Sequence, residues 1–341
     1  MLAPARFKTF QDAYIGVLEY VSHHYEYRNS PRGNASHECI GLSFQLSNPR
    51  ERSLYLPARK VNPAFHFAEA LWYLGGRDDL AMMAHYSPRM REFSRDGKTI
   101  PSAYGSRIFN AAGANSSQFE TVLRLLRTEE DSKRAVLQVF RPEELVRQDN
   151  PDVSCVIALH LLVRDERLHM VCYMRANDAN RGLVADAFSF TFIQEYAAVL
   201  LGLKLGTYTH HVGSMHIGDR DMDRVARILA ATDASPRTRR SEFAFPAMPA
   251  GTSAATIATV LAHEEALRHN EIGYRPDDIA AMELPSYWRQ IVLVFEIHRQ
   301  IAYNRDRTVS EAALEALHPG LRWLVANKWP KHVPSSARST Q

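Results

Sequence analysis

Residues 155–163 read CVIALHLLV and residues 167–174 read RLHMVCYM. Both runs are rich in the β-branched and large apolar residues that favour strands, and the polar residues 164–166 between them favour a turn. The two runs therefore predict an antiparallel β-hairpin. The next long apolar segment, AFSFTFIQEYAAVLLGLKLG at 187–206, predicts a largely buried helix that ends at a glycine. This order predicts a chain that packs helices on a sheet.

Helical patterns lie on both sides of this region. Residues 9–28 carry apolar side chains at helical spacing. Residues 62–76, NPAFHFAEALWYLGG, begin with an asparagine that can cap a helix and a proline suited to its first position, and they end in two glycines. Residues 233–255 shift to proline, serine, arginine and glycine. Beyond them the pattern is helical to about residue 328.

Composition limits the class of protein. Of the 341 residues, 45% are apolar and 23% charged, so the chain can bury a large core. A net charge of +3 is too balanced for a general polyanion binder. Three cysteines argue against a disulfide framework and for a reducing compartment. We find no apolar run of about 18 residues that suggests a membrane span and no secretory signal, and we expect a cytoplasmic protein.

The common nucleotide and metal motifs are absent from the sequence. It has neither a P-loop nor a G-x-G-x-x-G segment, so a nucleotide would be held by side chains. His210, His211 and His216 lie close in sequence but lack the i, i+4 spacing of a helical zinc motif. We predict no metal site.

Cys155 is a candidate nucleophile. It begins a predicted strand directly after the turn-forming segment QDNPDVS, at the mouth of the hairpin. A nucleophilic thiolate needs nearby cations, and basic residues follow in the sequence. Taken alone, a cysteine at the start of a strand is more often a small buried apolar residue. That second interpretation is the one we give to Cys39 and Cys172.

Glu69 is a candidate catalytic acid or base. Phe65 lies four residues before it and Trp72 three residues after it, so all three share the apolar face of the helix predicted at 62–76. A buried carboxylate without a partner is costly. This position therefore favours a functional role.

A set of motifs in one order resembles the folate-dependent thymidylate synthase family over roughly residues 20–230. Cys155 matches the nucleophile of that family, and YMRAND at 173–178 resembles its phosphate motif. RGLVADAFSF at 181–190 resembles its pyrimidine-reading segment, and HHVGSMHIGD at 210–219 its sugar motif. Upstream, EALWYLGG around Glu69 and the triplet Ala103-Tyr104-Gly105 match two further motifs of the family.

The resemblance implies a fold and a set of site residues. The fold is an α/β protein of the α+β type, with a mixed, mainly antiparallel sheet and flanking helices, and the cofactor is 5,10-methylenetetrahydrofolate. The chain is expected to form a homodimer through the sheet. The implied site residues are Cys155, Glu69, Asp186 and Tyr104 for catalysis; Arg32 and Arg175, with Lys133 and Arg134 of the neighbouring subunit, for phosphate; Asp186, His216, Ala176 and Gly218 for base and sugar; and Asp178 and Trp72 for folate.

The resemblance also suggests how the chain is divided. We expect a catalytic domain over residues 1–250 and a helical C-terminal extension over 251–330 that packs on it. Residues 331–341, KHVPSSARSTQ, are polar, and we expect a flexible tail. The sequence gives the extension no role.

One departure from the family pattern concerns the base. Asp186 stands where the family has an asparagine that reads uracil. Cytosine presents an N3 acceptor and an N4 amino donor, and a carboxyl group that is protonated, or shares a proton with N3, matches both. The structural alternative is that Asp186 caps a helix beginning near Ala187. Deoxycytidylate hydroxymethylases of the same fold are similar in having aspartate here, so we expect a cytosine nucleotide.

Other departures concern the sugar, the phosphate and the water around the base. Gly218 replaces a tyrosine that binds the ribose 3′-OH in the family, and Ala176 replaces a serine of the phosphate motif. Both changes make room for a 2′-OH. Val156 and Met174 replace a histidine and a glutamine that order water near the base. With these departures, the sequence resembles a CMP 5-hydroxymethylase of nucleoside antibiotic biosynthesis.

We therefore expect the chain to hydroxymethylate CMP at C5. Cys155 adds to C6 of the base, the folate supplies one carbon, and water placed by Glu69 completes the hydroxymethyl group. Hydroxymethylation of dCMP is an alternative, and thymidylate synthesis is another that Asp186 counts against. A catalytically silent nucleotide- or RNA-binding protein, suggested by RTRR at 237–240, remains a further alternative. The pair of Cys155 and Glu69 counts against it, and we expect no nucleic-acid partner.

Overall fold

The computed structural model describes residues 3–111, 115–146, 150–232 and 243–334. In these residues the strands form one seven-stranded sheet in the order β1-β3-β7-β6-β5-β4, with β2 paired to β3. Its pairs β1/β3 and β6/β7 are parallel and the others antiparallel. The predicted mixed, mainly antiparallel sheet is confirmed. The strands are β1 Ala5–Phe7, β2 Tyr27–Asn29, β3 Ser36–Leu46, β4 Val136–Gln138, β5 Val156–Arg164, β6 Arg167–Asp178 and β7 Lys204–Gly218.

The predicted hairpin is β5 and β6. The two strands pair antiparallel from Arg164 opposite Arg167 back to Val156 opposite Met174. Asp165 and Glu166 between them have φ angles of 51° and 55°, the left-handed values of a tight turn that matches strand twist. A bulge between Val156 and Ala158 interrupts the pairing at the other end. The bulge therefore lies next to Cys155, as bulges often do beside active sites.

The long apolar helix is α7, Gly182–Leu201, and it differs from the prediction at both ends. It begins five residues earlier, so Asp186 lies inside the helix and the capping position belongs to Arg181. The helix-capping interpretation of Asp186 is therefore wrong. Gly202 ends the helix at φ 69°, a left-handed value that suits glycine. Residues 204–206 belong to β7.

By length and composition alone, α7 could cross a membrane, which corrects the expectation that no stretch comes close. However, 78% of its apolar window is buried inside the molecule. Such burial is typical of the core helix of a globular protein.

The helix predicted near residue 62 is α2, Pro63–Leu74. The Asn62 side chain accepts from the backbone N–H of Phe65 at 3.1 Å, as an N-cap does. Gly105 at the start of α4 lets that helix approach α2, because a Cβ there would lie 2.4 Å from the Tyr73 Cα. The other helices up to residue 232 are α1 Phe10–His24, α3 Leu80–Tyr86, α4 Tyr104–Phe109, α5 Gln118–Thr128, α6 Glu143–Val146 and α8 Met222–Ala230.

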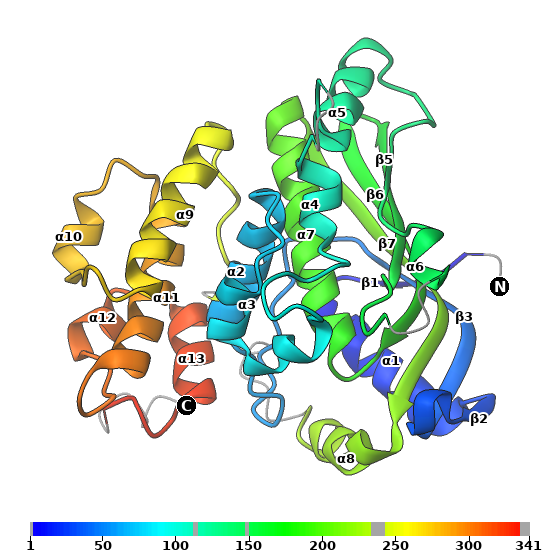
Figure 1. The fold of residues 1–341 in the computed structure, drawn as a ribbon, viewed down its shortest axis with the longest axis horizontal. Helices are drawn as coiled ribbons and strands as arrows, with labels where there is room; N and C mark the ends of the chain where they lie inside the picture. Colours follow the sequence, from blue (N-terminus) through cyan, green and yellow to red (C-terminus); the bar gives the residue numbers. More distant parts are fainter. Residues whose placement is uncertain (1–2, 112–114, 147–149, 233–242, 335–341) are drawn as a thin grey trace.

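The two faces of the sheet differ in burial. A row of facing residues across β4, β5, β6, β7 and β3 is buried under the helices, and it comprises Leu137, Leu159, Cys172, His210 and Phe44. The other face exposes apolar residues, with Val136 43%, Ile157 42% and Tyr173 39% exposed. The core therefore lies on one side of the sheet, and α2 packs on the outer side of α7 (Figure 1).

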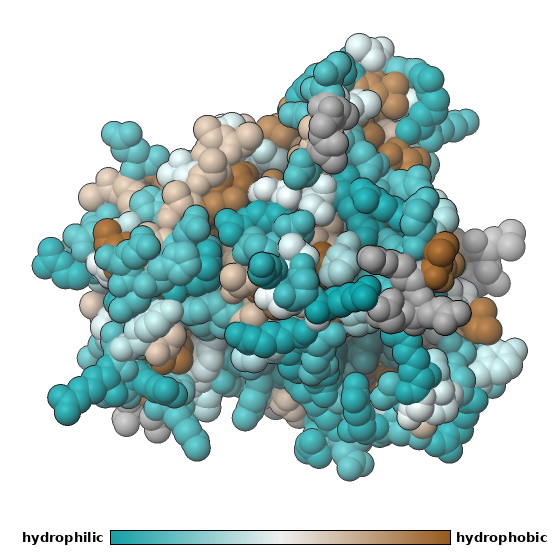
Figure 2. Space-filling model, viewed as in Figure 1, coloured by the Kyte–Doolittle hydropathy of each residue, from teal (hydrophilic) through white to brown (hydrophobic). Residues whose placement is uncertain are grey.

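The helices that follow residue 250 continue this layer beyond α2 (Figure 1). They are α9 Ala254–Arg268, α10 Pro276–Ala280, α11 Ser286–Tyr303, α12 Glu311–Glu315 and α13 Pro319–Lys328. Trp288 of α11 is fully buried against Phe192 of α7, with ring centroids 6.1 Å apart. The Tyr86 hydroxyl at the end of α3 donates to Glu264 at 2.8 Å. Outside this core, hydrophilic residues cover most of the face shown in Figure 2.

Part of the predicted tail is packed. The Val309 N–H donates to the His332 carbonyl at 2.8 Å, and Val333 is 2% exposed. The tail prediction is therefore wrong for residues 331–334, because they pair with the segment before α12. Residues 335–341 and the RTRR run at 237–240 lie outside the described residues.

Candidate active site

Two carboxyl groups, the buried Glu69 and the partly buried Asp186, form the centre of the candidate site, and we call them the carboxyl pair. Glu69 is 7% exposed on α2 and accepts from the Ser189 hydroxyl on α7 at 2.8 Å. Burial, with a smaller contribution from Asp186, raises the pKa of Glu69 to about 8. Burial also raises the pKa of Asp186 to about 7, against the effect of a hydrogen bond from Asn177. Both groups can therefore gain or lose a proton near neutral pH.

Cys155 lies just before β5 and is partly exposed. Arg175 on β6 places its Nη2 3.6 Å from the Cys155 Sγ. The guanidinium is held there because it donates to the carbonyls of Ser154 and Val153 at 2.8 and 2.7 Å. Burial raises the pKa of the Cys155 thiol to about 11, and Arg175 opposes this. The thiol is therefore neutral before substrate binds, and a base or added positive charge has to favour the thiolate.

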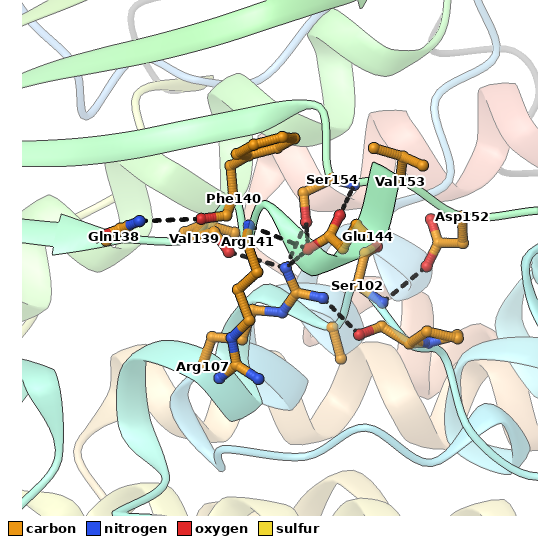
Figure 3. Close-up of polar contacts among 12 residues, drawn as sticks. Ser102, Arg107, Gln138, Val139, Phe140, Arg141, Glu144, Asp152, Val153 and Ser154 are labelled. Carbon is orange, nitrogen blue, oxygen red and sulfur yellow. Dashed lines mark hydrogen bonds and ion pairs between the residues drawn. The ribbon is translucent and has the colours of Figure 1, made fainter. Parts of the chain in front are cut away.

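A buried polar network holds the residue before the nucleophile, as Figure 3 shows. The backbone N–H of Ser154 donates to Glu144 Oε2 at 2.6 Å, and Arg107 donates to the Ser154 hydroxyl at 2.6 Å. Arg107 and Glu144 also form an ion pair. Nearby, Asp152 accepts from the backbone N–H of Ser102 at 2.9 Å. Because these groups are buried and paired, they fix the chain that carries Cys155.

Tyr104 lies beside Cys155. Its ring stacks on Tyr73 of α2 with centroids 5.5 Å apart. Its hydroxyl accepts a hydrogen bond from the Cys155 backbone, while burial keeps the pKa of the phenol well above its usual value. Tyr104 is therefore a neutral group at any ordinary pH, able to donate a proton in a hydrogen bond.

The residues predicted to contact the sugar lie where β6 and β7 run side by side. Ala176 faces Ser214, and Asp178 faces His216, in the parallel pairing of these strands. Gly218 ends β7, and the nearest atoms to a Cβ placed there are 3.9 Å away or more. The backbone therefore leaves room for a larger side chain, or for a larger ligand, at Gly218.

The predicted phosphate residues fall into two groups. Arg32 lies on an exposed turn with φ 51°, and its charge makes a small contribution that lowers the pKa of Cys155. Lys133 and Arg134 lie before β4, and Arg134 forms an ion pair with Glu129. Within the described parts of this single chain, neither reaches Cys155 or the carboxyl pair by a hydrogen bond.

The two predicted folate residues have different surroundings. Asp178 accepts from the backbone N–H of Arg181 at 2.7 Å, and burial raises the pKa of its carboxyl group. Trp72 is 2% exposed and its indole N–H donates to the Asp79 carbonyl at 3.1 Å. Trp72 is therefore a core residue, and we withdraw its folate role.

Sequence reasoning did not identify a buried polar chain that ends at Asp186. Asn177 Nδ2 donates to Asp186 Oδ2 at 2.7 Å, Asn177 Oδ1 lies 3.1 Å from His210 Nε2, and His210 Nδ1 lies 2.7 Å from the Tyr208 hydroxyl. His211 points to the opposite face of the sheet, where it contacts Ser43. Within the described residues no group of three or more His, Cys, Asp or Glu side chains is placed to hold a metal ion. The alternation Tyr208, His210 on one strand face was the signal that could have revealed the chain.

Comparison with known proteins identifies the family. The thymidylate synthase family profile matches residues 12–244, so the chain belongs to the thymidylate synthase family. It is 29% identical over 225 residues to a deoxyuridylate hydroxymethyltransferase of Bacillus phage SP01, covering 61% of this chain and 59% of the relative. It is 33% identical over 192 residues to a protein of the same name from Pseudomonas phage M6, covering 56% and 54%. A thymidylate synthase of Symbiobacterium thermophilum is 25% identical over 171 residues, covering 46% and 60%.

The chain spans a little over half the length of these curated relatives. The matched part includes strands β2 to β7, Cys155 and the carboxyl pair. The helices α9 to α13 lie outside the family match.

Proposed function

We propose that the protein is a folate-dependent one-carbon transferase that hydroxymethylates C5 of CMP. The single observation that carries this proposal is Asp186, a partly buried carboxyl group at the predicted base-reading position whose pKa is raised to about 7 by desolvation. A carboxyl group that is half protonated near neutral pH matches the cytosine edge, since one oxygen donates to N3 while the other accepts from the N4 amino group. A uracil edge presents the opposite order of groups.

Covalent activation of the base is assigned to Cys155. Its Sγ bonds to C6 of the cytosine, and the electron pair displaced from the C5–C6 double bond makes C5 nucleophilic. A proton shared between Asp186 and N3 makes C6 more electrophilic. Arg175 lies against the thiol and the charge of Arg32 makes a smaller contribution that lowers the pKa of Cys155, so both favour the thiolate while they bind the phosphate. Tyr104 stands beside the thiol and can hydrogen-bond the base during proton transfer at C5.

Glu69 is assigned to the water that completes the product. When bound, 5,10-methylenetetrahydrofolate supplies the one-carbon unit, and Asp178 holds its pterin. The pKa of Glu69, about 8 because of burial, lets the carboxylate accept a proton from water near neutral pH. Val156 and Met174 face each other across β5 and β6 and are buried. Because neither orders water, Glu69 is the polar group left to place the attacking molecule.

The ribonucleotide is supported by space at the sugar. A Cβ at Gly218 would meet no atom closer than 3.9 Å, and Ala176 offers no hydroxyl. Together with Asp186, these residues resemble the CMP 5-hydroxymethylase of mildiomycin biosynthesis. We propose a role for the product in nucleoside antibiotic formation. The free state of all three cysteines is in keeping with a cytoplasmic enzyme.

We propose that two copies pair through the open face of the sheet. Val136, Ile157 and Tyr173 expose large apolar side chains there, a cost that a protein interface removes. Lys133 and Arg134 precede β4 at the edge of the same face. In such a dimer they would reach the phosphate in the neighbouring site.

A second candidate is hydroxymethylation of a uracil nucleotide. It is favoured by the phage relatives, which are named deoxyuridylate hydroxymethyltransferases. Asp186 with a protonated carboxyl group opposes it, because the uracil N3–H would then face a donor. dCMP hydroxymethylation shares the base argument and differs only at the sugar.

The test is incubation of the purified chain with methylenetetrahydrofolate and each of CMP, dCMP, UMP and dUMP, followed by mass analysis of the products. We expect hydroxymethyl-CMP as the fastest product. A uracil nucleotide as the best substrate would overturn the base assignment, and dCMP well ahead of CMP would overturn the sugar assignment. A methylated product would show that hydride, and not water, adds to the one-carbon unit. If none of the four nucleotides gives a product, the protein is a nucleotide-binding protein without this activity.

A further inference from the structure

In the buried polar chain that ends at Asp186, all the hydrogen bonds must run from donor to acceptor in one common direction. Asn177, His210 and Tyr208 are 3%, 0% and 0% exposed, so no water competes for their hydrogen bonds. An asparagine amide has one donor side and one acceptor side, and a neutral imidazole has one donor nitrogen and one acceptor nitrogen. Once one group in such a chain takes an orientation, its neighbours must follow.

The chemistry at the two ends favours one orientation. The Tyr208 hydroxyl lies 2.7 Å from His210 Nδ1 and also contacts the Cys172 thiol. A ring nitrogen is a much better acceptor than a thiol sulfur, so the Tyr208 proton points to Nδ1. The His210 proton is then on Nε2, where it donates to Asn177 Oδ1. Burial keeps this imidazole neutral, since it lowers the pKa of His210 to about 3.

The same orientation determines which oxygen of Asp186 carries a proton. Asn177 Nδ2 donates to Asp186 Oδ2 at 2.7 Å, so Oδ2 is always an acceptor. When Asp186 is protonated, the proton therefore lies on Oδ1, which donates to N3 of cytosine. Oδ2 has a second lone pair for the N4 amino group. In the reversed orientation, the Asn177 carbonyl would accept a hydrogen bond from a protonated Oδ2. Oδ1 would then be free to accept a hydrogen bond from N3–H of uracil.

We propose that the chain Tyr208–His210–Asn177 sets which oxygen of Asp186 is protonated and so selects cytosine over uracil nucleotides. The three are positioning residues that act through Asp186. This proposal rests on the proposed function, because it assumes that Asp186 reads the base.

The test uses Tyr208→Phe, which removes only the hydroxyl that donates to His210. A matched control is Tyr55→Phe, since the Tyr55 hydroxyl is also buried and donates to the Phe243 carbonyl at 3.1 Å, away from Asp186. The readout is kcat/KM for CMP divided by kcat/KM for UMP, with thermal unfolding as a check on folding. We expect Tyr208→Phe to lower this ratio about tenfold through a gain with UMP, and Tyr55→Phe to leave it unchanged.

A second variant, His210→Phe, keeps the aromatic stack on Phe44 but frees the Asn177 amide. It should lower the ratio at least as much as Tyr208→Phe, and His210→Gln, whose amide can again donate to Asn177, should recover part of it. An unchanged ratio in Tyr208→Phe and His210→Phe, both folded and active, would overturn the proposal. If wild type prefers CMP and Asp186→Asn lowers that preference, such a result refutes the chain alone. If wild type prefers UMP, the proposed function itself is wrong.

Discussion

Buried carboxyl groups behave differently in two regions of the molecule. In the part of the chain that the structure describes, no cation makes a hydrogen bond to Glu69 or Asp186, and burial raises both pKa values. Glu195 on the far part of α7 is 2% exposed but meets Arg50 at 2.8 Å and Arg52 at 2.5 Å. Burial alone would raise the pKa of Glu195, yet the two arginines outweigh it and the pKa is lowered. We call these three residues the Glu195 cluster.

The comparison shows what a cation does for a buried acid. The Glu195 carboxylate also accepts a hydrogen bond from the Met248 N–H at 3.0 Å. The charged Glu195 therefore links the segment before α9 to α7. The carboxyl pair is left without such partners, which costs stability but keeps its protons exchangeable near neutral pH. One region uses burial for structure, and the other uses it to tune proton affinity.

The largest expected effect is at the nucleophile beside the carboxyl pair. Cys155→Ala should lower single-turnover product formation by about a thousandfold or more, because no other group can bond to C6. Affinity for CMP, measured by calorimetry, and the melting temperature should change little. Retention of more than a few per cent of activity would remove Cys155 from the mechanism.

Matched amide substitutions test the comparison directly. Glu69→Gln should lower kcat by about 10² to 10⁴-fold without loss of folding stability. Glu195→Gln leaves Arg52 and Arg50 without their buried partner and should destabilise the fold by about 3–5 kcal/mol, with normal kcat per folded molecule. Urea denaturation and steady-state kinetics on both variants measure this. If the two variants lose the same property, the distinction between the regions fails.

The pH dependence of stability should differ in sign between the regions. The pKa of Glu69 is raised in the fold, so its contribution is complete below about 4.5, the ordinary value, and is lost as pH rises toward about 8. Wild type should lose about 1.4 kcal/mol per pH unit across that window relative to Glu69→Gln. Urea denaturation at several pH values between 5 and 8 measures the slope, and parallel curves would contradict the raised pKa.

The Glu195 cluster should show the opposite pH dependence of stability. Because the pKa of Glu195 is lowered in the fold, its contribution is present above the ordinary carboxyl value and is lost as pH falls below it. The stability gap between wild type and Glu195→Gln should therefore narrow on acidification. A gap that widens toward low pH would mean that the arginines do not hold the carboxylate ionised.

A smaller effect is expected for base choice. Asp186→Asn replaces the carboxyl group by an amide of the same size, which matches the uracil edge. The ratio of kcat/KM for CMP to that for UMP should fall by at least about tenfold, roughly 1.4 kcal/mol. A smaller change would show that Asp186 does not read the base.

The smallest effect is expected at the sugar. Wild type should prefer CMP over dCMP by roughly tenfold, since the room at Gly218 and Ala176 admits a 2′-OH without a dedicated donor. Gly218→Tyr with Ala176→Ser should erase this preference by crowding the 2′-OH. A double-mutant cycle separates the two sites. An unchanged preference in the double variant would assign sugar choice to other residues.

The sequence predicted those features that depend on local pattern. The hairpin, the caps of α2 and the place of Glu69 on a buried face follow from residues near one another in the chain. Features that depend on strand register were missed. Asn177 and His210 lie 33 residues apart and meet only because β6 and β7 pair in parallel. The folate role of Trp72 came from the family resemblance, which does not show that almost every residue of α2, Trp72 included, is buried in the core.

The placement of α2 has a consequence for protein engineering. Every residue of this helix except Phe65 is buried, with α7 on one side and α9, α11 and α13 on the other. The family match ends at residue 244, before those outer helices begin. A chimera that transplants only the matched part would thus carry Glu69 on a helix that lacks its packing partners α9, α11 and α13. Exchanging α9 to α13 between relatives offers a way to retune the acidity of Glu69 without touching a residue that meets substrate.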